Sequence, residues 1–420
     1  MSQQRKPIRV LYSFPHKLGA SRICYTAWQQ VSGLAGAGAD VLVFPGALTK
    51  PVSSNVRVVP TLAKGRLRIP YKLIGSMRAF ALHDYIVSRR IEKLAGQIDI
   101  VHTWPLGALR TLKTSARLGI PTVLERPNAH TRFAYEVVQR ECERLGVELP
   151  PDHEHAYKPE VLRIEEQEYQ LADRLLCPSE FVAKTFLDRG FRPNQLARHF
   201  YGVDARSFCP GPPRERQRPF TMIFVGACAV RKGLHFALEA WLKSPASRDG
   251  KFLIVGSFIP SYERQLRPML SEPSVKVLGH RQDVADLMRA SDVFVLPTLE
   301  EGSALVTSEA RACGCVLLVS EASGAICRHG ENALVHRVGD VRTLSLDITR
   351  LYEDQALLAR LRDKSLSTVN QITWTAAGVN LLNIYREIIG NCPEAGLSSG
   401  VDSACTPLVS EALPDFSKQT

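Results

Sequence analysis

The sequence predicts an α/β protein with two doubly wound parallel-sheet domains. Both halves of the chain alternate short apolar, β-branched runs with longer segments of helical periodicity, as parallel sheets covered by helices do. The chain has 420 residues, 45% of them hydrophobic, and is too long for one ordinary core. At 209–219, Pro, Gly and charge replace the apolar periodicity. We therefore expect an N-terminal domain over 1–208, a linker, and a C-terminal domain over 220–372.

The N-terminal half begins with a predicted strand over 8–14, a loop that contains Gly19, a helix from about Arg22, and a second strand over 40–46. The glycine-rich run at 36–40 raises the question of a dinucleotide-binding fingerprint. Such a fingerprint follows a strand and opens a helix, whereas this run ends a helix and enters a strand. We therefore predict a doubly wound sheet without that fingerprint.

Polar residues lie at the ends of two further predicted strands in this half. They are His102 in the segment 99–105, and Glu125, Arg126, Asn128 and His130 in the segment 121–130. Side chains at the carboxyl ends of parallel strands tend to face a ligand crevice, so these residues are candidates for the site. For His102 we favour a buried, hydrogen-bonded side chain over a direct ligand. For His130 the two interpretations carry equal weight.

The run DHEH at 152–155 contains residue types that bind metals. It lies in a loop flanked by prolines, so an ordinary loop is the favoured interpretation. No Asp-x-Asp pair follows a predicted strand. We therefore expect no metal site.

In the C-terminal half, a predicted strand over 221–226 leads through a loop to an amphipathic helix over 232–242, with Arg231 and Lys232 at the mouth of the loop. The loop lacks the GxxxxGK[ST] order of an ATPase phosphate loop. A lysine at a helix start opposes the helix dipole unless an anion lies between them. These residues therefore indicate a bound phosphate.

A second strand, loop and helix unit contains two carboxylates. A buried strand is predicted over 292–298 and a helix over 304–313. Glu301 lies in the turn and Glu309 lies about a helical turn and a half inside the helix, so both can face one crevice at the end of the strand. Two glutamates alone usually mark a solvated surface, but the neighbouring phosphate-binding pattern favours a ligand site.

The start of this helix is predicted from its capping residue. Ser303 is the expected N-cap. The amides of Ala304 and Leu305 would then point at an anion.

Together these segments resemble the C-terminal half of retaining glycosyltransferase family 4, whose fold is called GT-B. The strand-ending glycine, Lys-Gly and Glu-Ala of the first family pattern are met by Gly226, Lys232, Gly233, Glu239 and Ala240. The second pattern is met by Asp292, Pro297, Glu301, Gly302, Glu309, Ala312, Cys313 and Gly314, and a closing loop by Gly330, Glu331, Asn332, Gly339 and Asp340. One branch of the family is resembled by Glu166, Tyr169, Ala172, Asp173, Pro178, Ser179, Glu180 and Phe181.

The resemblance implies an enzyme with two Rossmann-like domains that face a cleft. The N-terminal domain would bind the acceptor and the C-terminal domain the nucleotide-sugar donor. A helix over 373–390 would cross back and complete the N-terminal domain. The implied reaction is hexosyl transfer with retention of configuration, without an enzyme nucleophile, to a glycan or lipid-linked acceptor in cell-surface polysaccharide or glycolipid assembly.

The resemblance also assigns roles to site residues. Lys232 and Arg231 would hold the leaving diphosphate without a metal or other cofactor, Glu301 would accept hydrogen bonds from the sugar, and Glu309 from the ribose. Residues expected at the donor are Gly19, Gly226, Arg231, Lys232, Glu301, Gly302, Ser303, Ala304, Leu305 and Glu309. Those expected in catalysis are Lys232, Glu301, Arg231 and His130, and those on the acceptor side are His102, Glu125, Arg126 and Asn128. For Gly19, a structural turn is an equally good interpretation.

The sequence departs from the family pattern at two positions. Ala227 stands where the family commonly has arginine, and we hypothesise that Arg231 supplies the second cation. Ala304 stands where the family has glycine. These departures keep two alternatives open: a GT-B phosphorylase-like enzyme, and a catalytically weak scaffold that binds sugar nucleotides.

The formal net charge is +11, yet basic residues are not interleaved with stacking aromatics, so we expect no nucleic-acid partner. Basic residues gather over 64–93, with apolar residues between them. This pattern is typical of a helix on an anionic membrane surface. A solvated, substrate-facing helix pair is the equal alternative.

The sequence predicts a cytoplasmic protein, peripheral on the inner face of the plasma membrane if the basic segment binds lipid. No apolar run approaches 18 residues, and Arg9 interrupts the first apolar segment, as in neither a membrane span nor a signal peptide. The ten cysteines are scattered without CxxC pairs, which favours reduced thiols. Residues 391–420 are polar and aperiodic, and we expect a disordered tail.

Overall fold

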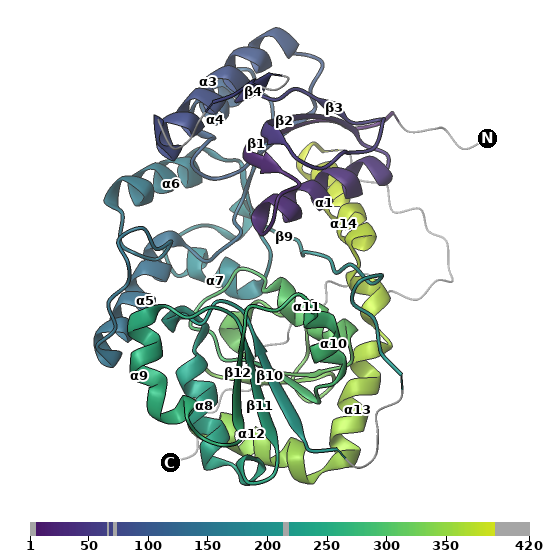
Figure 1. The fold of residues 1–420 in the computed structure, drawn as a ribbon. Coiled ribbons are helices and arrows are strands. Elements are labelled where there is room, and N and C mark those ends of the chain that lie inside the picture. Colours follow the sequence, from purple (N-terminus) through teal and green to yellow (C-terminus); the bar gives the residue numbers. More distant parts are fainter. Residues whose placement is uncertain (1–5, 65–66, 70–73, 213–217, 391–420) are drawn as a thin grey trace, which may run out of the picture.

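The computed structural model describes residues 6–64, 67–69, 74–212 and 218–390. These form two parallel sheets connected through helices, one above the other in Figure 1. The prediction of two doubly wound parallel-sheet domains is confirmed. The expected tail over 391–420 and part of the expected linker lie outside the described residues.

The N-terminal sheet has the strand order β3-β2-β1-β6-β7-β8-β9, and its neighbouring strands are parallel. The strands are β1 (Arg9–Leu18), β2 (Asp40–Leu48), β3 (Arg57–Val58), β6 (Ile100–Thr103), β7 (Thr122–Glu125), β8 (Arg174–Cys177) and β9 (Leu196–Arg198). The helices are α1 (Ile23–Gly36), α3 (Ser76–Leu94), α4 (Leu109–Arg117), α5 (Thr131–Leu145), α6 (Pro159–Leu171) and α7 (Glu180–Leu187). A short antiparallel pair, β4 (Ala63–Lys64) and β5 (Leu67–Arg68), stands apart. The strand order reverses beside β1, where open α/β sheets form their ligand crevice.

The first strand is longer than predicted. It was expected to end at 14, but Lys17 and Leu18 still pair with Ala47 and Leu48 of β2. An irregularity between Phe14 and Lys17 shifts the register, which breaks the local apolar pattern. The loop that leads to α1 therefore begins after Leu18.

The C-terminal sheet has the order β12-β11-β10-β13-β14-β15, again with parallel neighbours. Its strands are β10 (Thr221–Val225), β11 (Lys251–Val255), β12 (Val275–Gly279), β13 (Val293–Leu296), β14 (Val316–Ser320) and β15 (Ala333–His336). The helices are α8 (Leu234–Lys243), α9 (Pro260–Leu270), α10 (Val284–Arg289), α11 (Leu305–Ala312), α12 (Val341–Glu353), α13 (Gln355–Leu366) and α14 (Trp374–Ile388). Short 3-10 turns occur in both domains: η1 (Pro193–Gln195) precedes β9 of the N-terminal sheet, and the others are η2 (Val230–Lys232), η3 (Pro245–Ser247), η4 (Glu321–Ser323) and η5 (Val369–Ile372).

The last helix, α14, crosses back to the N-terminal domain, as predicted, and Figure 1 shows it beside α1. Its residues Leu381, Leu382 and Tyr385 are buried in the same core as residues of β1 and α1. The two helices approach closely at a pair of glycines, because a Cβ on Gly378 would lie 2.5 Å from the carbonyl carbon of Gly33. This contact ties the end of the described chain to its first helix.

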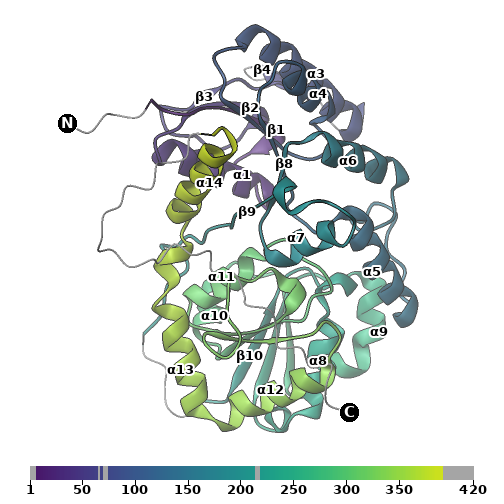
Figure 2. The same cartoon turned by 180° about the vertical axis from the view of Figure 1, so that it is seen from behind.

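A second connection between the domains lies on the opposite side of the molecule, where Figure 1 and Figure 2 show α5 next to α9. Val138 and Cys142 of α5, with Val147 after it, are buried in the hydrophobic core of the C-terminal domain. Glu141 Oε1 also lies 2.8 Å from His235 Nε2 on α8. Residues 131–147 therefore pack across onto the other domain, although they follow β7 of the N-terminal sheet.

Candidate active site

Arg231, Lys232 and Glu301 form an ion-pair cluster between the loops that follow β10 and β13. Arg231 Nη1 donates to Glu301 Oε2 over 2.9 Å, and Lys232 Nζ pairs with the same oxygen. β10 and β13 are parallel neighbours, so both loops leave the sheet at the same edge. The three residues expected to handle the donor phosphates and sugar thus lie in contact, with Glu301 only 8% exposed.

The loop after β10 differs from the predicted helix start. Val230–Lys232 forms the 3-10 turn η2, and α8 begins only at Leu234. Between them, Gly233 has a φ of 68°, and a Cβ there would lie 1.9 Å from the carbonyl oxygen of Pro297. The carbonyl of Arg231 accepts two hydrogen bonds from the β13 loop, each of 2.8 Å. These backbone contacts hold the two cations against the loop that carries Glu301.

The charges in this cluster stabilise one another. Burial on its own would raise the pKa of Glu301, but Arg231 and Lys232 outweigh it and hold the pKa at about 2. Burial lowers the pKa of Lys232, and Glu301 opposes that shift. Glu301 is therefore a carboxylate at neutral pH, and it neutralises the cations that an incoming anion would contact.

Glu309 lies on α11 in a different electrostatic environment. Burial raises its pKa to about 7. Within the described ranges of the chain, no basic side chain forms an ion pair with its carboxylate. Burial also raises the pKa of Tyr25 on α1, and the nearby charge of Glu309 raises it further. Glu309 thus lies where α11 meets the N-terminal domain, with a carboxylate that a ligand hydroxyl could neutralise by hydrogen bonding.

The start of α11 is one residue later than predicted. Ala304, not Ser303, is the N-cap, and no side chain caps the helix. The Ala304 amide donates to the carbonyl of Ser323 over 3.3 Å, so it is engaged within the protein. Leu305, the first helical residue, packs against a buried cluster of Tyr201, Trp374 and Ala377, and Tyr25 of the N-terminal domain packs against the same cluster.

Gly302 brings the donor loop against the N-terminal domain. A Cβ at this position would lie 1.7 Å from the carbonyl oxygen of Pro127, so a larger residue would push the two segments apart. Ser179 Oγ donates to the carbonyl of Gly302 over 2.7 Å and also caps α7, because it accepts from the amide of Val182. Asn128 follows Pro127 and is exposed, and its backbone nitrogen would lie 3.1 Å from a Cβ on Gly302.

Two glycines expected at the donor lie in the loops that follow strands. Gly226 comes directly after β10. Gly19 comes directly after β1, has a φ of 89°, and lies against Lys50. The positive φ gives Gly19 a structural reason to be glycine.

Glu125 and His102 lie inside the N-terminal domain, away from its surface. Glu125 is fully buried, and its carboxylate contacts His199 Nε2, Tyr201 OH and Gln30 Nε2, each at 2.8 Å. His102 Nδ1 lies 2.6 Å from Tyr385 OH of α14, so the favoured interpretation of a buried, hydrogen-bonded histidine describes its position. Burial lowers the pKa of His102 to about 3. These two residues join strands and helices of the domain and do not line an open surface.

Arg126 and His130 are also enclosed. Arg126 is 2% exposed, its guanidinium carbon lies 4.4 Å from the centre of the Tyr169 ring, and its Nη2 lies 3.5 Å from Glu165. His130 caps α5, because its Nδ1 accepts from the amide of Arg132 over 3.2 Å. Burial, with Arg126 nearby, lowers the pKa of His130 to about 3. Both side chains therefore support the loop that carries Asn128.

Sequence reasoning missed the role of Glu300 and placed His155 only in a metal alternative. His155 Nε2 lies 2.9 Å from Glu300 Oε1, and Arg231 Nη1 lies 3.3 Å from the same oxygen. Glu154 Oε1 approaches Arg231 Nη2 at 3.5 Å. In the described part of the chain, no group of three or more His, Cys, Asp or Glu is arranged to hold a metal ion. Glu154 and His155 of the DHEH run instead extend the ion-pair cluster.

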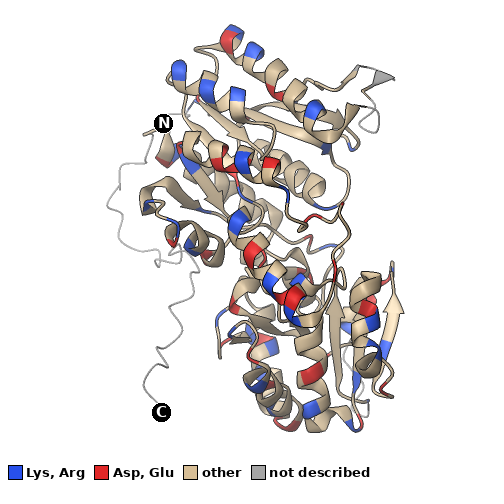
Figure 3. Cartoon of the chain, turned by 90° about the vertical axis from the view of Figure 1, so that its left-hand side faces the viewer, with Lys and Arg blue, Asp and Glu red and all other residues tan. Residues whose placement is uncertain are grey.

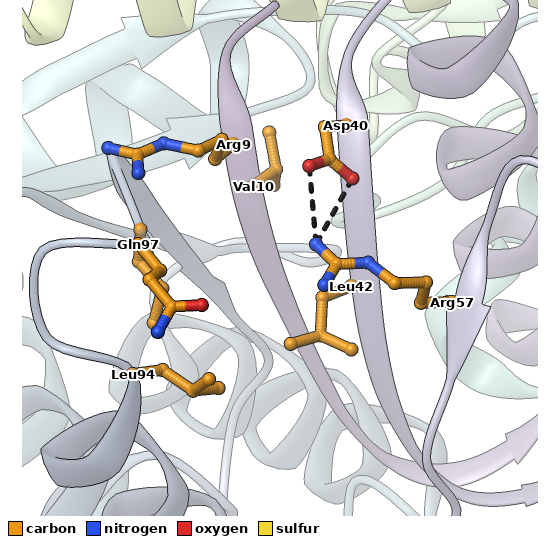
Figure 4. A pocket seen from close by; sticks show the side chains of 8 residues that line it. Arg9, Val10, Asp40, Leu42, Arg57, Leu94 and Gln97 are labelled. Carbon is orange, nitrogen blue, oxygen red and sulfur yellow. Dashed lines mark hydrogen bonds and ion pairs between the residues drawn. The ribbon is translucent and has the colours of Figure 1, made fainter.

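A small hollow elsewhere in the protein is shown in Figure 4. Its volume is about 10 Å³, and Arg9, Asp40 and Arg57 line it at the first residues of β1, β2 and β3. It therefore lies at the opposite ends of the parallel strands from the loop that leads to α1. Its size admits a water molecule at most.

Two protein-family models match the chain. The model described as "Glycosyltransferase Family 4" matches residues 25–207, and the model described as "Glycosyl transferases group 1" matches residues 219–354. The first match covers the strands of the N-terminal sheet except β1, and the second covers the strands of the C-terminal sheet.

Two curated relatives match over most of their length. The UDP-Gal:alpha-D-GlcNAc-diphosphoundecaprenol alpha-1,3-galactosyltransferase of Escherichia coli is 23% identical over 82% of this chain and 88% of that protein. The D-inositol 3-phosphate glycosyltransferase of Thermobispora bispora is 24% identical over 83% of this chain and 82% of that protein. Among solved structures, sucrose-phosphate synthase from Thermosynechococcus elongatus superimposes with a TM-score of 0.67, at 19% identity, over 92% of this chain and 100% of that chain. This chain and the synthase share the fold of two parallel-sheet domains.

Proposed function

Because the chain belongs to the GT-B glycosyltransferases of family 4, we propose that it moves a sugar from a nucleotide-sugar donor to a glycan or lipid-linked acceptor in cell-surface polysaccharide or glycolipid assembly. The observation that carries the proposal is the cluster of Arg231, Lys232 and Glu301 at the strand ends, with Glu309 on the next helix. The residue types at these four positions match the needs of a sugar diphosphate: two cations for its phosphates and two carboxylates for its hydroxyls.

The chemistry proposed for the site follows from the charge of the leaving group. When the bond between the sugar and the diphosphate breaks, new negative charge develops on the diphosphate and must be neutralised. Arg231 and Lys232 supply two positive charges there, so the proposed reaction needs no divalent metal. The donor phosphates replace Glu301 as their partner, and Glu301 turns to the hydroxyls of the transferred sugar.

Glu309 is proposed to hold the nucleotide ribose. Its side chain is half-buried and has no ion-pair partner among the described residues, and hydroxyl donors would stabilise its charged form. Retention of the anomeric configuration, through attack from the face of the leaving group, is proposed from the family resemblance. The departure at Ala227 is compatible with transfer because Arg231 comes from the same loop and directly contacts Glu301.

The donor is identified by a thermal-shift panel of UDP, GDP, ADP and their common sugar conjugates. A ligand that binds only the folded state raises Tm, so we expect one nucleotide family to stabilise the protein. The same ligands should leave Tm unchanged in Glu309→Ala. If no nucleotide raises Tm, the proposal fails in favour of the phosphorylase-like enzyme. If a sugar nucleotide raises Tm but no nucleoside diphosphate is released with any acceptor, the scaffold alternative replaces it.

The acceptor is proposed to be lipid-linked because of the outer face of α3. The two relatives differ in acceptor, since one is named for a diphosphoundecaprenol lipid and the other for inositol 3-phosphate. On α3, the exposed residues at helical spacing are Arg78, Leu82, Tyr85, Arg89 and Lys93. Figure 3 shows the basic residues of the chain in blue. No helix among those described is long and apolar enough to span a bilayer.

This face combines positive charge with exposed apolar side chains, as membrane-surface helices do. Tyr85 is 49% exposed and Leu82 is 37% exposed, between basic residues one to two turns away. We propose that it rests on the anionic inner face of the plasma membrane, where a lipid-linked acceptor would be met. Residues 65–66 and 70–73 of the predicted basic segment lie outside the described residues.

Liposome co-sedimentation tests the membrane contact. The protein should bind vesicles that contain phosphatidylglycerol at low salt and dissociate in high salt. The double substitution Arg78→Gln with Lys93→Gln should weaken binding about 30-fold, at about 1 kcal/mol per basic residue. Arg264→Gln with Arg267→Gln, an equal loss of exposed charge on α9, is the matched control and should bind like the unmodified protein. Absence of binding to anionic vesicles at low salt would disprove the contact.

A further inference from the structure

His155 reaches from the N-terminal half of the sequence into the ion-pair cluster of the C-terminal domain. It is 7% exposed, and its Nε2 lies 2.9 Å from Glu300 Oε1, which is fully buried. We propose that His155 is a positioning residue of the donor site: it holds the Glu300 carboxylate so that Arg231 can point at the donor diphosphate. This inference rests on the proposed function.

The need for such a residue follows from the charges around Arg231. Arg231 Nη1 contacts three acceptors: the Glu301 carboxylate at 2.9 Å, the Glu300 carboxylate at 3.3 Å and the Glu300 carbonyl at 3.3 Å. When a diphosphate binds, Arg231 must turn toward it. Without another partner, the Glu300 carboxylate would then be left buried and unpaired, which is strongly unfavourable.

His155 gives Glu300 that second partner. The histidine donates through Nε2 to the carboxylate oxygen that Arg231 shares, so part of the guanidinium is released for the phosphates. Histidine can hold the carboxylate either as a neutral N–H donor or as a cation. Lys232 is not a substitute, because it pairs with Glu301 in the unliganded protein and with the donor phosphates in the proposed complex.

The loop around His155 is itself fixed. The His155 amide donates to His153 Nδ1 over 3.1 Å, and Lys158 Nζ donates to the His153 carbonyl over 3.0 Å. Val138 and Cys142 anchor the preceding helix, α5, in the core of the C-terminal domain. The loop that carries His155 therefore follows a helix that packs on the C-terminal domain, the same domain that contains Glu300.

The protein contains a matched comparison. His235 Nε2 and Glu141 Oε1 form a second His–Glu pair between the same two parts of the chain, at 2.8 Å. Among the described residues, the other ion-pair partner of Glu141 is Arg144, not Arg231. A change at Glu141 thus perturbs the docking of α5, while a change at His155 perturbs both the docking and Arg231.

The test measures the affinity for UDP and UMP, with GDP and GMP in parallel, by isothermal titration calorimetry. The monophosphate lacks the second phosphate, so the ratio of the two affinities reports on the diphosphate contact. His155→Leu should weaken binding of the diphosphate by about 10- to 100-fold and change the monophosphate much less. His155→Gln should retain most of the affinity, because its amide can still donate to Glu300.

Three results show whether the effect comes from His155 itself, from the docking of α5, or from a failure of the proposed function. Glu141→Gln should leave the diphosphate-to-monophosphate ratio unchanged; an equal loss of the ratio would mean that α5 docking is responsible and would overturn the inference. His155→Leu combined with Glu300→Gln should cost no more than His155→Leu alone; additive losses would likewise overturn it. If the unmodified protein binds neither UDP nor GDP, the proposed function fails, whereas normal binding with an unaffected His155→Leu ratio refutes only the role of His155.

Discussion

Lys232→Ala is expected to lower kcat/KM for sugar transfer by about 100- to 1000-fold, the cost of removing one preorganised group that stabilises transition-state charge. Lys232 pairs with Glu301 in the unliganded protein, and in the proposed reaction it exchanges that partner for the departing diphosphate. The measurement is release of the nucleoside diphosphate from the donor that the thermal-shift panel selects. Lys243→Ala, at an exposed lysine near the end of the following helix, is the matched control and should keep full activity.

Arg231→Ala tests whether this arginine replaces the cation absent at Ala227. Arg231 contacts both Glu300 and Glu301, and these carboxylates hold its pKa above the usual value although burial opposes them. We expect a loss comparable to that of Lys232→Ala, because both cations face the same charge. Full turnover by Arg231→Ala, together with an inactive Lys232→Ala, would show that one cation suffices and that the hypothesis is wrong.

The strand, loop and helix units of both domains could be predicted because their signals are local. Apolar runs of strand length and amphipathic helices identify the two sheets. Glu301 and Glu309 both belong to one strand, loop and helix unit, formed by β13 and α11, so their spacing could be read from the sequence. The local sequence pattern does not predict the backbone where contacts with a distant segment determine it. The 3-10 turn at Val230–Lys232 delays α8, since Gly233 must fit beneath a carbonyl of the β13 loop that is distant in sequence.

Glu301 and Glu125 were both predicted to face a ligand, because each is a polar residue at the end of a predicted strand, but the structure places them differently. Glu301 meets cations at the loops between the domains, whereas Glu125 is enclosed by His199, Tyr201 and Gln30, which come from other elements. Nothing near Glu125 in sequence predicts these partners. The His155 contact with Glu300 was missed for the same reason, because 145 positions separate the two residues.

Glu309→Gln is expected to raise the stability of the unliganded protein while removing its affinity for the nucleotide. Burial raises the pKa of Glu309 from 4.5 to about 7, so the native state binds a proton more tightly than the unfolded state does. Between those two values the native state holds more protons, and the free energy of unfolding falls as pH rises. Above pH 7 the whole cost is present, and it amounts to up to about 3 kcal/mol.

Thermal unfolding at pH 5 and pH 8 separates the cost of the Glu309 charge from a change in stability that does not depend on this charge. Glu309→Gln should raise Tm at pH 8 and change it little at pH 5, where the wild-type carboxyl is already protonated. Glu272→Gln, at an exposed glutamate, is the matched control and should change Tm little at both values. An equal rise at both pH values would contradict an origin in the Glu309 charge.

The same carboxylate should then make nucleotide affinity depend on pH. Ribose hydroxyls donate to the charged form, so binding lowers the pKa of Glu309 and affinity should increase as pH rises through about 7. Glu309→Gln should bind weakly at every pH and lose this dependence. The half-buried Glu309 carboxylate destabilises the free protein, and a ligand hydroxyl would remove that cost. A binding site would retain such a carboxylate, but a purely structural position would not. The ion pairs of Glu301 show that this loop region can neutralise a glutamate when only stability is required.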